Sequence, residues 1–164
     1  MIEILEKYSG KSLLDEDGNQ ISIEKSQEIS NNDLQKFEMF HNMTLPTDLR
    51  ELLLFSNGIK IFGVEIQALE EMEFYEDHRF LTFHSWGNGD FDCISVDQEN
   101  DYGTVHFLNH SVANSVSMNI RFSEWISLAI DEIQHKGVIL HPMDYLFRHQ
   151  EGMYKEVFLK LKIK

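Results

Sequence analysis

Hydrophobic residues recur at helical spacing in the first third of the chain, alternate with polar residues through the middle, and return to helical spacing near residue 125. The first pattern predicts helices over residues 2–8, from Asn31 or Asn32 to about His41, and from Pro46 to Asn57. In the second of these helices, the spacing places Leu34, Phe37 and Phe40 on a buried face.

The helix from Pro46 carries the strongest local signals. Proline loses no hydrogen bond in a first helical turn, and Asp48 places negative charge where the helix dipole favours it. Its buried stripe is expected to consist of Leu45, Leu49, Leu52, Leu53 and Ser56. Asn57-Gly58 supplies residues that tolerate a left-handed backbone, so the helix is predicted to end there.

The middle of the chain has the two-residue period of strands. Strands are predicted over residues 59–66, 80–84, 91–96, 104–108 and 115–120, and over 13–14 and 21–23 on either side of a turn cluster at 15–19. Asn88-Gly89 favours a hairpin between the strands that flank it. The strands from residue 80 onward are therefore expected to form an antiparallel meander.

A further helix is predicted from Ser123, its expected cap, to Gly137, its expected terminator. Its buried face would carry Trp125, Ile126, Ala129, Ile130 and Ile133. Beyond it, Pro142 is expected to open a short helix, and residues 153–164 fit either a helix or an edge strand. The order of elements predicts an α+β fold, in which an antiparallel β-meander sheet packs against N-terminal helices and a following helix.

Length and composition favour one soluble domain over residues 1–164. The chain is 42% hydrophobic and 26% charged and has two prolines, with no linker between two halves. Cys93 is the only cysteine and lies in an apolar run, so we expect a buried, inert thiol. Because no leader and no membrane-length apolar run of ~20 residues occurs, a cytoplasmic location is expected.

The net charge of −14 is concentrated in one part of the chain. Residues 65–101 hold eleven acids and one base, Arg79, which gives −11 + 1 = −10. Such a segment repels nucleic-acid phosphate. It serves either solubility alone or attraction of a basic partner.

Tests for chemistry give weak signals. Gly87-Asn88-Gly89 is followed by an acid and not by a helix, which argues against a phosphate site. His84, His106 and His110 lie in or beside predicted strands, where residues four apart are separated by ~13 Å, so no metal site is expected. No nucleophile elbow or characteristic cysteine context occurs. The sequence therefore predicts neither an enzyme nor a cofactor.

The order of several short motifs resembles the SUKH superfamily. These motifs are NDLQKFE at 32–38, the helix from Leu45-Pro46 to Asn57-Gly58, FGVEI at 62–66, WGNGD at 86–90, GTVHF at 103–107 and FSEWI at 122–126. The resemblance spans about Asn31 to Gly137. It implies either a regulator similar to the yeast cell-wall-synthesis proteins of the Smi/Knr type or, as for most bacterial members, an immunity protein against a polymorphic toxin.

This resemblance and the acidic segment together favour a protein that occludes a basic, nuclease-type toxin. Aromatic residues among charges are frequent interface anchors, although Trp86 could equally pack its hairpin onto the core. The expected contact residues are Glu71, Glu73, Tyr75, Glu76, Asp77, Trp86, Asp90, Asp92, Asp97, Glu99, Asp101 and Tyr102. A small enzyme or ligand-binding domain with a pocket beside the sheet, and a regulatory scaffold, are the alternatives. A paired C-terminal strand could also form a weak homodimer.

Overall fold

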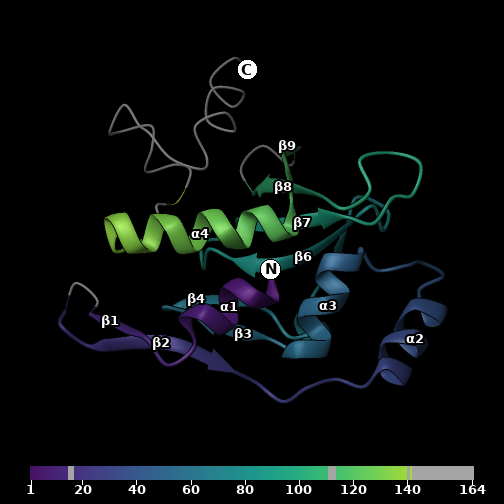
Figure 1. Cartoon of the computed structure of the whole chain (residues 1–164). Coiled ribbons are helices and arrows are strands. Elements are labelled where there is room, and N and C mark those ends of the chain that lie inside the picture. Colours follow the sequence, from purple (N-terminus) through teal and green to yellow (C-terminus); the bar gives the residue numbers. More distant parts are fainter. Residues whose placement is uncertain (15–16, 111–113, 140, 142–164) are drawn as a thin grey trace.

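The computed structural model describes residues 1–14, 17–110, 114–139 and 141, and Figure 1 shows their arrangement. The helices are α1 (Ile2–Tyr8), α2 (Asn31–Phe40), α3 (Thr47–Phe55), the 3-10 turn η1 (Leu69–Glu71) and α4 (Phe122–Lys136). The strands are β1 (Ser12–Leu14), β2 (Gln20–Lys25), β3 (Ile59–Ile61), β4 (Val64–Ile66), β5 (Phe74–Tyr75), β6 (Phe80–Ser85), β7 (Phe91–Ser95), β8 (Thr104–Asn109) and β9 (Asn114–Arg121). The predictions for Pro142 and for 153–164 lie outside the described residues. The α+β class is confirmed.

Two antiparallel sheets are present where one was predicted. Four strands follow the order β1-β2-β3-β4 and five follow the order β5-β6-β7-β8-β9, so each sheet is a meander. Between β4 and β5 the chain passes through η1, which interrupts the ladder. The sheets still touch there, because the Gln67 amide donates to the Phe83 carbonyl at 2.8 Å.

The predicted strand over 59–66 is a hairpin of β3 and β4. Ile61 pairs with Val64, and the two residues between them have positive φ, +50° at Phe62 and +86° at Gly63. Consecutive left-handed residues form the tight turns that match strand twist. The alternation of hydrophobic and polar residues continues through this turn, so the two-residue period alone did not predict it.

Pro46 is the N-cap of α3 and not a residue of its first turn, and the helix boundaries differ from those predicted in three further places. Ser30, and not Asn31 or Asn32, caps α2 by accepting the Asp33 amide at 3.2 Å. α3 ends at Phe55 with an extended Ser56, and the left-handed residue is Gly58, where an added Cβ would lie 3.1 Å from the Ala68 amide nitrogen.

The third difference is at α4, which begins at Phe122, so that Ser123 is inside the helix and not its cap. The left-handed end at Gly137 is confirmed, with φ +79°.

The core lies between α4, the five-stranded sheet and the α1–α3 pair, and α4 runs along the sheet in Figure 1. Phe83 contacts Phe122 and Trp125 edge-on, with ring centroids 4.9 and 5.1 Å apart. The predicted buried faces of α3 and α4 are confirmed. Cys93 is buried, and burial raises the pKa of its thiol.

Phe40 is a correction, because its side chain is 84% exposed. α2 packs on the molecule through Leu34 and Phe37, and Phe40 lies outside that buried side of the helix. Within the part of the chain described, no helix has the length and apolarity needed to cross a membrane.

Candidate partner-binding surface

The structure divides the predicted contact residues between two ends of the five-stranded sheet. β6 (Phe80–Ser85) leads to the 86–90 tip and β7 runs back, so this tip lies at one end and the loops 76–79 and 96–103 lie at the other. A six-residue strand is roughly 20 Å long, so about that distance separates the two ends.

Asp90 and Asp92 are corrections, since both are fully buried and cannot contact a partner. Asp90 accepts hydrogen bonds from the His110 amide at 2.9 Å and from Asn109 Nδ2 at 3.4 Å, and its carboxylate lies 2.6 Å from His110 Nδ1 and 2.8 Å from His141 Nε2. Asp92 lies in β7, the central strand of its sheet, whose residues 92–95 are all buried. Polar residues on such a strand do not face solvent, whatever their alternation suggests.

Trp86 is half-buried at the hairpin tip. Its ring lies edge-on to His84 and His141, with centroids 4.8 and 5.1 Å away. These contacts match the alternative role for Trp86, in which it packs its hairpin onto the core and is not an interface anchor. Burial lowers the pKa of His84, whose Nδ1 lies 2.7 Å from the Glu65 carbonyl oxygen.

Glu71, Glu73 and Tyr75 lie along the β5 edge of the sheet. The Glu71 carboxylate accepts the Ala68 amide at 3.0 Å and so closes η1. Glu73 accepts the Tyr75 hydroxyl at 3.3 Å, and the Tyr75 ring packs on Phe91. Burial raises the pKa of Tyr75, and Glu73 contributes in the same direction.

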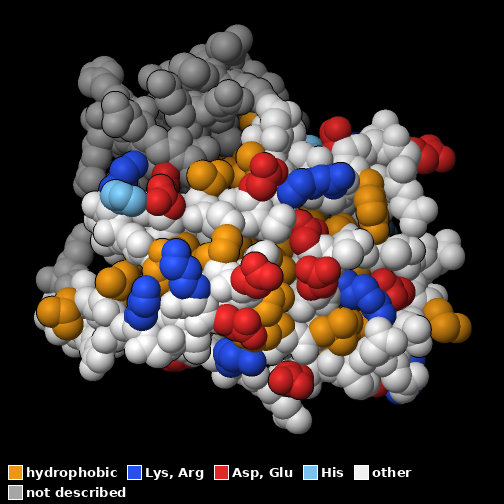
Figure 2. Space-filling model, in the orientation of Figure 1, with side chains coloured by type: hydrophobic (Ala, Val, Ile, Leu, Met, Phe, Trp, Pro, Cys, Tyr) orange, Lys and Arg blue, Asp and Glu red, His pale blue; other side chains and the backbone are white. Residues whose placement is uncertain are grey.

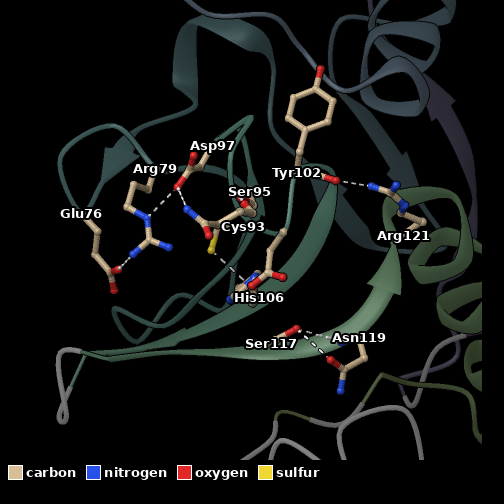
Figure 3. Close-up of polar contacts among 12 residues, drawn as sticks. Glu76, Arg79, Cys93, Ser95, Asp97, Tyr102, His106, Ser117, Asn119 and Arg121 are labelled. Atoms are coloured by element: carbon tan, nitrogen blue, oxygen red, sulfur yellow. Dashed lines mark hydrogen bonds and ion pairs between the residues drawn. The ribbon is translucent and has the colours of Figure 1, made fainter.

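The loop end of the sheet holds an acidic cluster around one arginine. Figure 3 shows Arg79 between Glu76 and Asp97, at nitrogen–oxygen distances of 3.6 and 3.2 Å. The Glu99 amide and the Asn100 side chain also donate to Asp97, and these bonds, with Arg79, lower the pKa of that carboxyl. Asp77 and Glu99 are exposed beside this cluster.

Tyr102 fixes the loop end to the helices. Its hydroxyl donates to the Thr44 carbonyl at 3.2 Å, and its own carbonyl accepts Arg121. The next residue must be glycine, because Gly103 has φ +75° and its missing Cβ would collide with the Arg121 guanidinium. Asp101 is 63% exposed, with its carboxylate 4.0 Å from His106.

An open groove of about 910 Å³ separates α2 from these loops. It is lined by α2, the link 41–44, Phe74, His78 and the loop 96–99, and we call it the α2 groove. The sequence analysis missed the α2 side, because it assigned Phe40 to the buried stripe and did not consider Met39. Two successive hydrophobic residues at the end of a helix, one of them outside the stripe, were the available signal.

Backbone strain is concentrated around the α2 groove. Seven non-glycine residues of the described chain have positive φ, and five of them lie at this end: Asn42, Glu76, Asp77, His78 and Asp101. Left-handed backbone costs a residue with a Cβ roughly 1–2 kcal/mol, less for Asn and Asp. Strain of this kind persists where the surrounding structure enforces it, and it clusters at binding sites.

Charge is not uniform over the surface. On the face seen in Figure 2, acidic side chains lie among lysines, arginines and hydrophobic side chains. The loop end has a clearer excess, since residues 76–79 and 96–101 contain five acids and one base, −5 + 1 = −4. No group of three or more metal-ligating side chains is arranged to hold an ion within residues 1–14, 17–110, 114–139 and 141.

The chain belongs to the SMI1 / KNR4 family (SUKH-1), whose family model matches residues 28–128. This stretch begins just before α2, ends within α4, and contains every residue that lines the α2 groove. A search of curated proteins found no match.

Proposed function

We propose that this protein is a non-catalytic, cytoplasmic immunity protein that binds and occludes a basic toxin of the nuclease type. Family membership supports the general class, because the family includes immunity proteins. The observation that carries the proposal is the acidic loop end beside an open groove: its two loops carry five acids and one base, Arg79, which pairs with Glu76 and Asp97.

Occlusion requires no catalytic group. The long-range field of an acidic surface speeds the encounter with a basic protein, while close contacts in the bound complex set its lifetime. A nuclease active site is basic because it binds phosphate, so an acidic cap competes with the nucleic acid for the same surface.

The experiment uses the proteins encoded by the neighbouring reading frames, each expressed separately and tested for binding to the full chain by calorimetry. We expect one basic partner, whose affinity falls several-fold between low and physiological salt. Glu76→Lys and Glu99→Lys should each weaken binding, whereas Glu24→Lys on β2 should not. Salt-insensitive binding would remove the steering argument, and equal effects of all three variants would remove the surface itself.

A small enzyme remains a second candidate because of one observation. The buried Asp90 carboxylate lies 2.6 Å from Nδ1 of His110, whose side chain is 50% exposed. A buried carboxylate that orients an accessible imidazole is the arrangement of a general base. If the toxin is bound normally by His110→Ala, this pair has no part in immunity; loss of a hydrolytic activity in that variant would favour the enzyme.

A further inference from the structure

The most exposed large hydrophobic side chains of the described residues are neighbours in α2. Phe40 is 84% and Met39 81% exposed, compared with 70% for Leu14 and below 40% for Leu54 and Leu128. Met39 lines the α2 groove, and the Phe40 ring lies edge-on to His41, a groove residue, with centroids 4.9 Å apart. Met39 therefore gives the helix side of the groove one exposed apolar side chain, between Glu38 and the neighbouring Phe40.

Four rings form a row that begins at Phe37 in α2, and the other three, His41, Phe74 and His78, line the groove. Phe37 contacts His41, His41 contacts Phe74, and Phe74 contacts His78, with centroid distances of 4.5, 4.7 and 4.7 Å. Burial lowers the pKa of His41, and His78 adds to this effect. Because these rings hold one another, this part of the groove is ordered without a ligand.

The opposite rim is acidic. On that rim Asp97 already pairs with Arg79 at 3.2 Å, and on the α2 side Glu38 pairs with Arg50 at 2.8 Å. Glu99 lines the groove and Asp77 precedes the groove residue His78; both are exposed and form no ion pair with any other described residue. A cationic side chain that enters the groove can therefore pair with these carboxylates without breaking an ion pair among the described residues.

We propose that the α2 groove is the docking site for a segment of a basic protein that presents an apolar side chain flanked by Lys or Arg. The apolar side chain covers Met39 and Phe40, and the flanking cation lies against Glu99 and Asp77. This deepens the proposed function and rests on it for the identity of the partner. A second copy of this chain is disfavoured as the occupant, since it would bring two acidic rims together.

The first test needs no knowledge of the partner. The probe is the heptapeptide Lys-Leu-Lys-Phe-Lys-Leu-Lys, titrated into the isotope-labelled full chain and followed by amide chemical shifts. We expect shifts at Met39, His41, His78 and Glu99. The peptide with Glu for every Lys, and the peptide with Ser for every Leu and Phe, should each bind at least tenfold more weakly.

Matched variants locate the contact. The double variant Met39→Ser/Phe40→Ser should weaken peptide binding about tenfold, as truncation of central apolar anchors does, and Glu99→Lys should weaken it several-fold. Leu14→Ser and Glu24→Lys, which change the same residue types elsewhere, should leave the affinity unchanged. Circular dichroism confirms that each variant is folded.

Three outcomes would overturn the docking site: shifts confined to other surfaces, equal losses in the test and control variants, or self-association of the free chain that Phe40→Ser abolishes. The two proposals fail separately. If a neighbouring gene product binds but groove variants retain its affinity, the docking site is wrong and the immunity function stands. If the peptide binds the groove and no neighbouring gene product binds the chain, the docking site stands and the immunity function is wrong.

Discussion

At the scale of single residues, sequence position alone does not decide whether an acid serves the surface or the core. Asp90 and Asp97 come from the same acidic segment, but Asp90 is fully buried among donors whereas Asp97 closes an exposed loop. A buried carboxylate is tolerated only where hydrogen bonds replace its hydration. Asn88, Asn109, His110 and His141 supply those contacts.

Asp90→Asn is expected to destabilise the fold without acting on partner binding directly. The new amide group points a donor toward donors, so at least one buried hydrogen bond is lost and another is replaced by a repulsive contact. The free energy of unfolding should fall by about 2–4 kcal/mol, measured by urea denaturation. Asp77→Asn, at an exposed position, is the control and should change it by less than about 0.5 kcal/mol.

His84 should make stability depend on pH. Burial lowers its pKa below the ordinary 6.5, with His141 acting in the same direction and the hydrogen bond to Glu65 opposing them. The unfolded chain therefore binds a proton near pH 6.5 that the folded chain still excludes. The contribution of His84 is complete above pH 6.5 and is lost as the pH falls below that value toward the folded pKa.

The measurement compares urea midpoints at about pH 7.5 and 5.5 for the wild type and His84→Asn. Asparagine keeps a side-chain donor for the Glu65 carbonyl but does not titrate, so the variant should lose less stability on acidification. Other groups, including His41, cancel in the difference. Equal pH sensitivity of the two proteins would show that His84 is not the source.

At the scale of elements, the N-termini of two long helices are satisfied in different ways. α2 uses its own Ser30, whose hydroxyl accepts the Asp33 amide. In α4 the N-cap Arg121 supplies no side-chain bond; Glu124 accepts the Arg121 amide at 2.8 Å, and the Ser123 amide donates to Asp48 of α3 at 3.0 Å. Asp48 therefore joins two helices that lie 75 residues apart in sequence, in addition to the role in its own first turn that the sequence predicted.

Asp48→Ala should consequently cost more than Ser30→Ala. Removing a cap costs about 1 kcal/mol, which is the loss expected at Ser30. At Asp48 the same loss at α4 is joined by the loss of favourable charge in α3, so about 1.5–2.5 kcal/mol is expected. Chemical denaturation of the two single variants decides this order. A smaller effect at Asp48 would mean that water replaces its bond to Ser123.

At the scale of the whole molecule, local signals were sufficient for most of the fold but not for its assembly. The strands at 80–84, 91–96 and 104–108 were predicted because each has a clear period and turn residues between. The separation into two sheets depends on contacts such as Gln67 with Phe83, which no local pattern records. Local patterns were also insufficient for the candidate site. The exposure of the Asp92 and Phe40 side chains depends on which other elements pack against β7 and α2.

Two charge variants of equal net charge distinguish whether total charge or its local placement governs association with the basic partner. The triple variant Asp77→Asn/Glu99→Gln/Asp101→Asn removes three charges from the loop end, and Glu6→Gln/Glu24→Gln/Glu28→Gln removes three exposed charges from α1, β2 and the segment after β2. Both change the net charge from −14 to −14 + 3 = −11. Steering depends on the potential at the contact surface, within a Debye length of ~8 Å at physiological salt. The first triple should therefore lower the association rate of the basic partner several-fold in stopped-flow mixing at physiological salt, and the second less than twofold. Equal slowing by both triples would assign the effect to overall charge and leave the loop end without a special role.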